Sequence, residues 1–316
     1  MEEILNSEAK PPGRTPTIKA YALGKALDLN NLFLKFEGAN ATGTQKDRIS
    51  EAHVLNALHN GYNGITVGTC GNYGASIAYF ANLYGVRSII GIPKDYSHER
   101  SGFIQSQNAE ILYYDGKYEE TVEYLHDFSD ANGYYDASPG SRNSYIDKAM
   151  YSSIATEIYE AIMKDPDYVI VPVGNGTTLS GIFNGFDHLL SEGYISKLPR
   201  MIGVSTKNGN PIVNAFKHGY RKAVDLNPSS LKETGVNEPL ISYRSFDGDE
   251  ALNAIYRSRG YALYVSDEEM IRYSNIIYNS EGLNSLPASA SAVAAINHMK
   301  VKKDDIIVSI ITGRRS

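Results

Sequence analysis

Residues 32–50 read LFLKFEGANATGTQKDRIS, and the organisation of the chain follows from this stretch. The apolar run 32–36 predicts a short strand, and residues 38–43 have the composition of a loop. From Thr44 onward apolar side chains recur at helical spacing, which predicts a helix. We therefore expect a strand, a loop and a helix in immediate succession.

Lys46 is expected in the first turn of that helix. Residues 44–47 fit the Ser/Thr-x-x-Asp/Glu capping box, in which Thr44 would accept a hydrogen bond from the backbone NH three residues on. The positive end of the helix dipole disfavours the ammonium form of a first-turn lysine, which would help to keep the amine nucleophilic near neutral pH. The alternative is a solvated surface lysine.

The composition argues against several classes of function. The 316 residues suffice for two core-bearing lobes or one large α/β domain, and a net charge of −6 argues against a nucleic-acid partner. No run reaches the roughly eighteen apolar residues of a membrane span, and the N-terminus does not resemble a signal peptide. The single cysteine, Cys70, agrees with a reducing compartment, so we expect a cytoplasmic protein. The seven histidines lack metal-ligand spacing, so no metal is expected.

Strands and helices alternate along the chain. Strands are predicted at 64–68, 87–92 and 109–114 with helices between them, and a second alternation runs from the strand 168–173 to the strand 306–311. Such alternation is typical of parallel βαβ units. We therefore expect an α/β fold with two doubly wound open sheets, in a small and a large lobe, and the active site between them.

The segment between the strand 64–68 and the next helix is a candidate binding loop. Backbone NH groups at a helix N-terminus point into the crevice of an open α/β sheet and would suit a substrate carboxylate. Asn72 adds a side-chain donor. The alternative is a plain turn that permits a left-handed residue. The candidate substrate-binding residues here are Thr69, Cys70, Gly71, Asn72 and Tyr73.

A second loop follows the strand 168–173 and has the features of a phosphate site. Glycines, hydroxyls and a helix N-terminus together bind a phosphate without a cation. It is not a dinucleotide fingerprint, because Leu179 stands where the third glycine would be. The alternative is a tight turn. The candidate phosphate-binding residues are Gly174, Asn175, Gly176, Thr177 and Thr178.

Thr312 follows the last apolar strand, where a neutral hydroxyl could meet a weak acceptor such as a ring nitrogen; its alternative role is a simple cap.

A reactive amine, a carboxylate loop and a phosphate loop together suit pyridoxal 5'-phosphate and a small amino-acid substrate. The competing class is a non-catalytic α/β protein that cradles a phosphorylated metabolite.

Four motifs resemble one enzyme family and occur in its order. Residues 40–48, NATGTQKDR, resemble the NPTGSFKDR signature of the fold type II pyridoxal-phosphate enzymes, the tryptophan synthase β family. The other matches are Gly71-Asn72, VPVGNG at 171–176 and EGLNSLPASA at 281–290. Within the family, VPVGNG and the terminal Ile-Thr-Gly are most similar to threonine synthases.

The resemblance implies roles for individual residues. Lys46 would be the Schiff-base lysine and general base, and Asn72 would bond the cofactor's ring hydroxyl. Residues 174–178 would hold the cofactor phosphate, and Thr312 would face the pyridine nitrogen, which favours elimination or replacement over transamination. Members of the family are commonly homodimers.

The expected domains follow from the same reasoning. Residues 50–145 would form the smaller α/β domain, with the substrate-carboxylate loop. Residues 1–49 and 146–316 would form the larger α/β domain, with the Schiff-base lysine and the cofactor-phosphate loop.

Departures from the family pattern concern the substrate. Cys70 stands where a hydroxyl residue normally helps to bind the substrate carboxylate, and Tyr73 stands where threonine synthases have a small hydroxyl residue. The leading expectation is conversion of O-phosphohomoserine and water to threonine and phosphate, with Arg142, Lys148 or Arg314 meeting the substrate phosphate. The alternatives are β-replacement on an activated serine, as in cysteine synthases, and deamination of serine or threonine.

Overall fold

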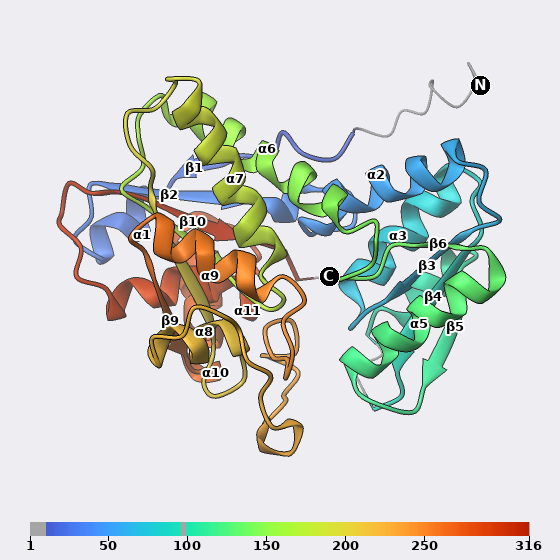
Figure 1. Ribbon diagram of the computed structural model, residues 1–316. Helices are drawn as coiled ribbons and strands as arrows, with labels where there is room; N and C mark the ends of the chain where they lie inside the picture. The colour runs from blue at the N-terminus through green and yellow to red at the C-terminus, as the bar shows by residue number, and fades with distance from the viewer. Residues whose placement is uncertain (1–10, 96–98, 316) are drawn as a thin grey trace. The chain divides into compact units, whose positions relative to one another are not determined.

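The chain forms two α/β units, each with a sheet of its own (Figure 1). The computed structural model describes residues 11–95 and 99–315; residues 1–10, 96–98 and 316 lie outside the described part. The smaller unit comprises Asn40–Ile146 and the described residues before Arg14, and the larger unit comprises Arg14–Ala39 and the chain from Asp147 onward.

The smaller unit has four parallel strands in the order β5-β4-β3-β6. Thr66 and Gly68 of β3 face helix α5, so Ile65 and Val67 point to the other face, where α3 packs. The unit is therefore doubly wound, as expected. Its elements are α2 (Lys46–His59), β3 (Ile65–Gly68), α3 (Asn72–Leu83), β4 (Ser88–Pro93), α4 (Ser101–Ser106), β5 (Glu110–Tyr114), α5 (Tyr118–Asn132) and β6 (Tyr135–Asp136).

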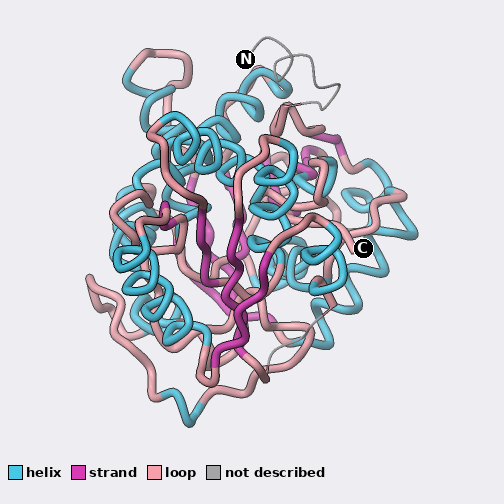
Figure 2. Tube along the Cα trace, turned by 90° about the vertical axis from the view of Figure 1, so that its right-hand side faces the viewer, coloured by secondary structure: helices cyan, strands magenta, loops and turns pink. Residues whose placement is uncertain are grey.

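The larger unit has six strands in the order β1-β2-β10-β7-β8-β9, with only β1 antiparallel to its neighbour among the described pairs. Helices α1, α10 and α11 pack together beside β2, β7 and β10, whereas α7, α8 and α9 pack on β7, β8 and β9. Figure 2, in which the side labelled β3, β4 and α5 in Figure 1 faces the viewer, shows strands with helices on either side of them. Long apolar strands such as β7 and β10 are buried on both faces, which is the reason for their continuous apolar sequences.

The elements of the larger unit are β1 (Thr17–Lys19), α1 (Tyr21–Ala26), β2 (Asn31–Phe36), the 3₁₀ turn η2 (Glu37–Ala39), α6 (Tyr145–Ile162), β7 (Tyr168–Pro172), α7 (Thr177–Ser191), β8 (Arg200–Thr206), α8 (Pro211–Lys217), η3 (Pro228–Ser230), α9 (Gly248–Arg257), β9 (Tyr261–Val265), α10 (Asp267–Glu281), α11 (Pro287–Ala294), η4 (Ala295–His298) and β10 (Ile306–Ile311). Helix α6 begins in the last residues of the smaller unit.

The expected α/β fold with two sheets is confirmed, but the division of the chain differs from the prediction. The prediction assigned residues 1–49 to the larger lobe, whereas Asn40 and the residues after it group with the smaller unit. Lys46 therefore belongs to the smaller unit. The reason is packing, because α2 lies against α3 and the Asp47 carboxylate accepts a hydrogen bond from Ser76 of α3.

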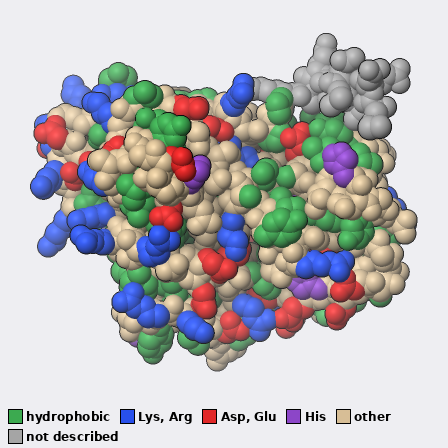
Figure 3. Space-filling view, turned by 45° about the horizontal axis from the view of Figure 1, so that its top comes forward, with side chains coloured by type: hydrophobic (Ala, Val, Ile, Leu, Met, Phe, Trp, Pro, Cys, Tyr) green, Lys and Arg blue, Asp and Glu red, His purple; other side chains and the backbone are tan. Residues whose placement is uncertain are grey.

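Charged side chains of both signs are interspersed over the face that Figure 3 shows. Among the described helices, none combines the length and the apolar character that crossing a bilayer requires.

Asp136, at the end of β6, organises the loop that leads to α6. Its Oδ2 lies 2.5 Å from Nδ1 of His126 on α5, and its Oδ1 accepts from the backbone NH of Ser138 at 2.8 Å. The backbone carbonyl of Asp136 accepts from the side-chain amide of Asn143 at 2.8 Å. Burial lowers the pKa of His126, but the hydrogen bond to Asp136 and the charges of Asp136, Asp127 and Glu123 together outweigh burial, so this pKa is raised.

The His126–Asp136 pair should make stability depend on pH. Because the pKa of His126 is raised on folding, the pair contributes fully below about pH 6.5, the ordinary histidine value, and its contribution is lost as pH rises through the folded pKa. His126→Gln should lower the free energy of unfolding by on the order of 1 kcal/mol at about pH 5.5. Urea unfolding at about pH 5.5 and about pH 9 measures the difference.

The exposed His59, at the end of α2, offers the matched control. His59→Gln should change stability little at either pH. A destabilisation by His126→Gln that is equally large at both pH values would contradict the charged pair.

Candidate active site

Lys46 lies in the first turn of α2, as predicted, and is the first residue of that helix, with a half-buried side chain. Its Nζ lies 5.1 Å from the centroid of the Tyr73 ring. Tyr73 is buried, and its hydroxyl donates to the carbonyl of Ala137 at 2.9 Å, which holds the ring in place. The fold of the smaller unit thus brings Lys46 next to the loop that precedes α3.

The predicted capping box is wrong. Thr44 Oγ1 accepts from the backbone NH of Lys46 at 3.3 Å, two residues on, and α2 has no side-chain cap of the expected kind. Asp47 instead accepts from the backbone NH of Thr42 at 2.8 Å, from the Thr42 hydroxyl, and from Ser76 Oγ at 2.7 Å. Asp47 is fully buried, and a buried carboxylate requires such bonds. It therefore ties the loop before Lys46 to α3.

The predicted carboxylate loop is held by the hydroxyl of Thr69. Thr69 Oγ1 accepts from the backbone NH groups of Gly71 at 3.0 Å and of Gly74 at 3.3 Å. Gly71 has φ 134°, a conformation that side-chain-bearing residues rarely adopt. The loop then enters α3 at Asn72, and Cys70 is half-buried at its tip. A hydroxyl also carries one donor, so Thr69 can still donate to a ligand.

Arg142 occupies a different environment from the other predicted substrate residues. Its side chain is 63% exposed, and its Nη2 lies 3.5 Å from the carboxylate of Asp130. The neighbouring side chains of Ser141 and Asn143 are buried and bond the carbonyl of Asp136. The loop therefore directs its polar neutral residues inward and Arg142 outward.

The predicted phosphate loop joins β7 to α7 in the larger unit. Gly176 has φ 93°, and a Cβ there would lie 2.8 Å from Cβ of Ala251. A Cβ on Gly174 would lie 2.9 Å from the carbonyl oxygen of Pro239. Only glycine fits both positions. The first NH groups of α7 have no partner within the helix, so they and the helix dipole form an anion-binding end.

A buried carboxylate, that of Asp247, accepts a hydrogen bond from this loop. Asp247 accepts from Thr177 Oγ1 at 2.6 Å, and its other oxygen lies 3.1 Å from Nζ of Lys148. Burial raises the pKa of Asp247, and Thr177 and Lys148 oppose that shift. Burial lowers the pKa of Lys148, but Asp247 and Glu250 outweigh it, so the pKa of Lys148 is raised. The Asp247–Lys148 pair thus places little net charge behind the anion-binding end of α7.

Sequence reasoning missed these supporting residues. Asp247 lies 70 residues after Thr177, and Asn210, whose side-chain amide donates to the carbonyl of Gly174 at 2.9 Å, lies 36 residues after that glycine. No local pattern connects residues so far apart. Of these residues, only Lys148 is named from the sequence, and its predicted role is to meet the substrate phosphate.

Thr312 lies directly after β10, and its Oγ1 is 2.8 Å from Oγ of the buried Ser289. The backbone NH of Leu286 donates to the carbonyl of Gly313 at 3.0 Å. The motif at 281–290 therefore meets the end of the last strand. Arg314, next along the chain, donates from Nη1 to the carbonyl of Gly38.

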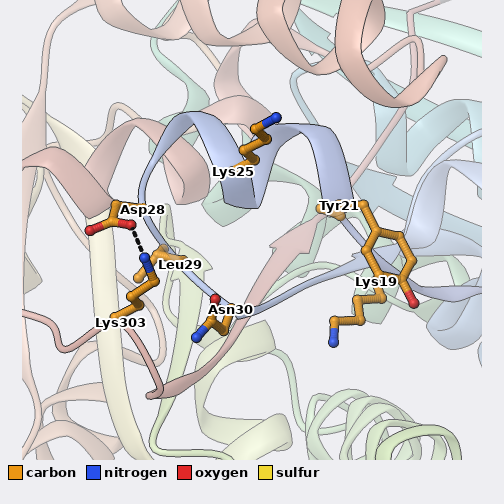
Figure 4. A pocket seen from close by; sticks show the side chains of 8 residues that line it. Lys19, Tyr21, Lys25, Asp28, Leu29, Asn30 and Lys303 are labelled. Atoms are coloured by element: carbon orange, nitrogen blue, oxygen red, sulfur yellow. Dashed lines mark hydrogen bonds and ion pairs between the residues drawn. The ribbon is translucent and has the colours of Figure 1, made fainter.

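A surface pocket of the larger unit is lined by none of the predicted site residues (Figure 4). Lys303 pairs there with Asp28 at 2.5 Å, and Lys19 lies over the Tyr21 ring at 5.3 Å. The pocket's lining also includes Lys25. Two of its lysines, Lys19 and Lys303, thus have partners within the pocket.

The predicted residues fall into two groups. The smaller unit holds Lys46, the loop 69–73 and Arg142, and the larger unit holds the loop 174–178 and Thr312. The NH groups at the N-terminus of α7 suit a phosphate, and Lys46 supplies an amine. Each unit, taken by itself, thus supplies a group that suits one part of pyridoxal phosphate, which carries both a phosphate and an aldehyde.

The chain is similar to several known proteins in sequence and in fold. The chain is 31% identical over 313 residues to the threonine synthase of Methanocaldococcus jannaschii, a match that covers 95% of this chain and 74% of that protein. Maize serine racemase has a similar fold, with a TM-score of 0.80, 18% identity, and coverage of 96% of this chain and 88% of that one. Threonine deaminase isoform 2 from Solanum lycopersicum gives a TM-score of 0.77 at 18% identity, with coverage of 100% and 88%.

The family model described as pyridoxal-phosphate dependent enzyme matches residues 9–313. The match spans both units and every predicted site residue. The expected family and the expected cofactor are therefore confirmed. The chain belongs to the family of pyridoxal-phosphate-dependent enzymes.

Proposed function

We propose that this enzyme is similar in activity to threonine synthases and converts O-phosphohomoserine and water to threonine and phosphate. The observation that carries the proposal is the position of Lys46, whose amine lies over the Tyr73 ring beside the loop 69–73. An amine and a carboxylate loop next to each other suit chemistry at the α-carbon of an amino acid. The likeness to threonine synthase over 95% of the chain supports the choice of substrate.

Each group of residues has a role in this proposal. When bound, pyridoxal phosphate acts as an electron sink that stabilises negative charge on the substrate carbon. Lys46 would hold the cofactor and carry protons to and from the substrate, and the backbone of the loop 69–73 would bind the substrate carboxylate. The loop 174–178 would bind the cofactor phosphate, and the Thr312 hydroxyl would meet the ring nitrogen without protonating it.

The two threonines at the start of α7 should differ in their contribution to phosphate binding. The hydroxyl hydrogen of Thr177 is donated to Asp247, so it is not available to a phosphate. Among the described residues, no acceptor is recorded for the hydroxyl of Thr178, which is 8% exposed. We therefore assign the hydrogen bond to the cofactor phosphate to Thr178.

Thr178→Val should weaken cofactor binding by roughly 10- to 100-fold, the usual worth of a hydrogen bond to a charged group. Thr177→Val should weaken it by less and should mainly lower the free energy of unfolding, because Asp247 loses a donor. Titration of apoenzyme with pyridoxal phosphate, followed by absorbance, measures both. Ser180→Ala, which removes only a bond to the Gly176 carbonyl, is the control. A larger loss of cofactor affinity in Thr177→Val than in Thr178→Val would refute the assignment.

Lys46→Ala should abolish both the visible absorbance of the bound cofactor and phosphate release from O-phosphohomoserine. The reason is that no other residue is proposed to link the cofactor or move the proton. A steady-state phosphate-release assay and an absorption spectrum give the two measurements. A wild-type protein that binds the cofactor but releases no phosphate would contradict the proposed threonine synthase activity. A wild-type protein without visible absorbance would favour a non-catalytic binding protein.

A second candidate function has a specific observation in its favour. All three cations considered for the substrate phosphate are engaged by other groups. Arg142 lies near Asp130, Lys148 bonds Asp247 and Glu250, and Arg314 bonds the Gly38 carbonyl. A substrate without a second phosphate requires none of them. Deamination of serine or threonine, or β-replacement on an activated serine, therefore stands as the alternative.

A panel of amino acids separates the two functions. Serine, threonine, O-acetylserine and O-phosphohomoserine would each be added to holoenzyme, and the change in cofactor absorbance and the products would be measured. Under the second function, serine or threonine should release ammonia, or O-acetylserine should react with an added nucleophile, while Arg142→Met leaves the rate within about twofold because that side chain is exposed. Turnover of O-phosphohomoserine alone would exclude the second function.

A further inference from the structure

Arg100 lies along the loop that precedes α3. Its Nε donates to Oδ1 of Asn72 at 3.1 Å. Its Cγ and Cβ lie 3.6 and 3.7 Å from the position that a Cβ would take on Gly71, which is ordinary van der Waals contact. Arg100 immediately precedes α4, which packs against α3. The side chain is therefore both packed on the loop and bonded to Asn72, the first residue of α3.

This bond determines which way the Asn72 amide faces. An arginine side chain has donors and no acceptor, so only the carbonyl oxygen of Asn72 can face it. The amide is planar, so its Nδ2 donors point the opposite way. Without a partner of defined character, the two ends of an asparagine amide are nearly isosteric and the group can turn over.

We propose that Arg100 is a positioning residue that directs the Nδ2–H of Asn72 at the ring oxygen of the bound cofactor. The proposal rests on the proposed function, in which Asn72 bonds that oxygen. The guanidinium also polarises the amide it bonds, which makes Nδ2–H a stronger donor. Arg100 thus acts on the cofactor through Asn72 and needs no contact of its own with the substrate.

The test is a pH titration of the visible absorbance of holoenzyme. A donor to the ring oxygen stabilises the deprotonated form of the lysine-linked chromophore. Loss of the hydrogen bond from Asn72 Nδ2–H should therefore raise the pKa of the chromophore. Arg100→Met should raise it by about 0.5 to 1 unit, the range that one hydrogen bond supplies. Arg100→Lys should recover part of the shift, because an ammonium group also donates to the asparagine oxygen.

A double-mutant cycle shows whether Arg100 acts through Asn72. Asn72→Ala should raise the chromophore pKa at least as much as Arg100→Met, and the double variant should raise it no further than Asn72→Ala alone. Arg87→Met is the matched control, since it removes the same side chain from the same unit, where Arg87 bonds Tyr134 and Glu110. It should leave the pKa unchanged.

Three outcomes would overturn the inference. The first is an unchanged pKa in Arg100→Met while Asn72→Ala shifts it, and the second is an additive effect in the double variant. The third is a raised KM for substrate in Arg100→Met with no change in the pKa, which would mean that Arg100 binds substrate directly. A wild-type protein without visible absorbance would instead contradict the proposed function.

Discussion

The position of Lys46 in the smaller unit depends on one buried carboxylate. Asp47 is fully buried and accepts hydrogen bonds from Thr42 in the loop before it and from Ser76 on the neighbouring helix α3. A buried charge without such bonds costs several kcal/mol, so the loop, α2 and α3 have to keep this arrangement. Because Lys46 directly precedes Asp47, the position of its amine over the Tyr73 ring follows from the same bonds.

The larger unit uses a comparable arrangement at its own loop. Asp247 is buried behind the start of α7 and bonds Thr177, as Asp47 bonds Thr42. A carboxylate near an anion site would repel a phosphate, and Lys148 at 3.1 Å offsets that charge. In each unit a loop hydroxyl therefore donates to a buried carboxylate, and at α7 this arrangement leaves the helix N-terminal NH groups for a ligand.

Sequence patterns predicted the long elements well and the short ones poorly. β10 was predicted at 306–311 and is found at Ile306–Ile311, because a buried apolar run bounded by polar residues is a strong signal. Three elements are too short to show a hydrophobic periodicity: β1 with three residues, β6 with two and α1 with six. The capping box failed because Asp47 found donors in Thr42 and Ser76 that lie outside the local pattern.

The sequence by itself determined the cofactor, and it predicted the lysine that we propose to hold it and the loops that we propose to bind phosphate and carboxylate. Glycines, hydroxyls and a first-turn lysine are local features, and their chemistry can be read without knowing what surrounds them. Only the tertiary structure decided that Lys46 joins the smaller unit, that Arg142 faces solvent, that Thr177 is committed to Asp247, and that Arg100 orients Asn72. Those are contacts between residues far apart in the chain, and their partners depend on packing between elements, which no local pattern specifies.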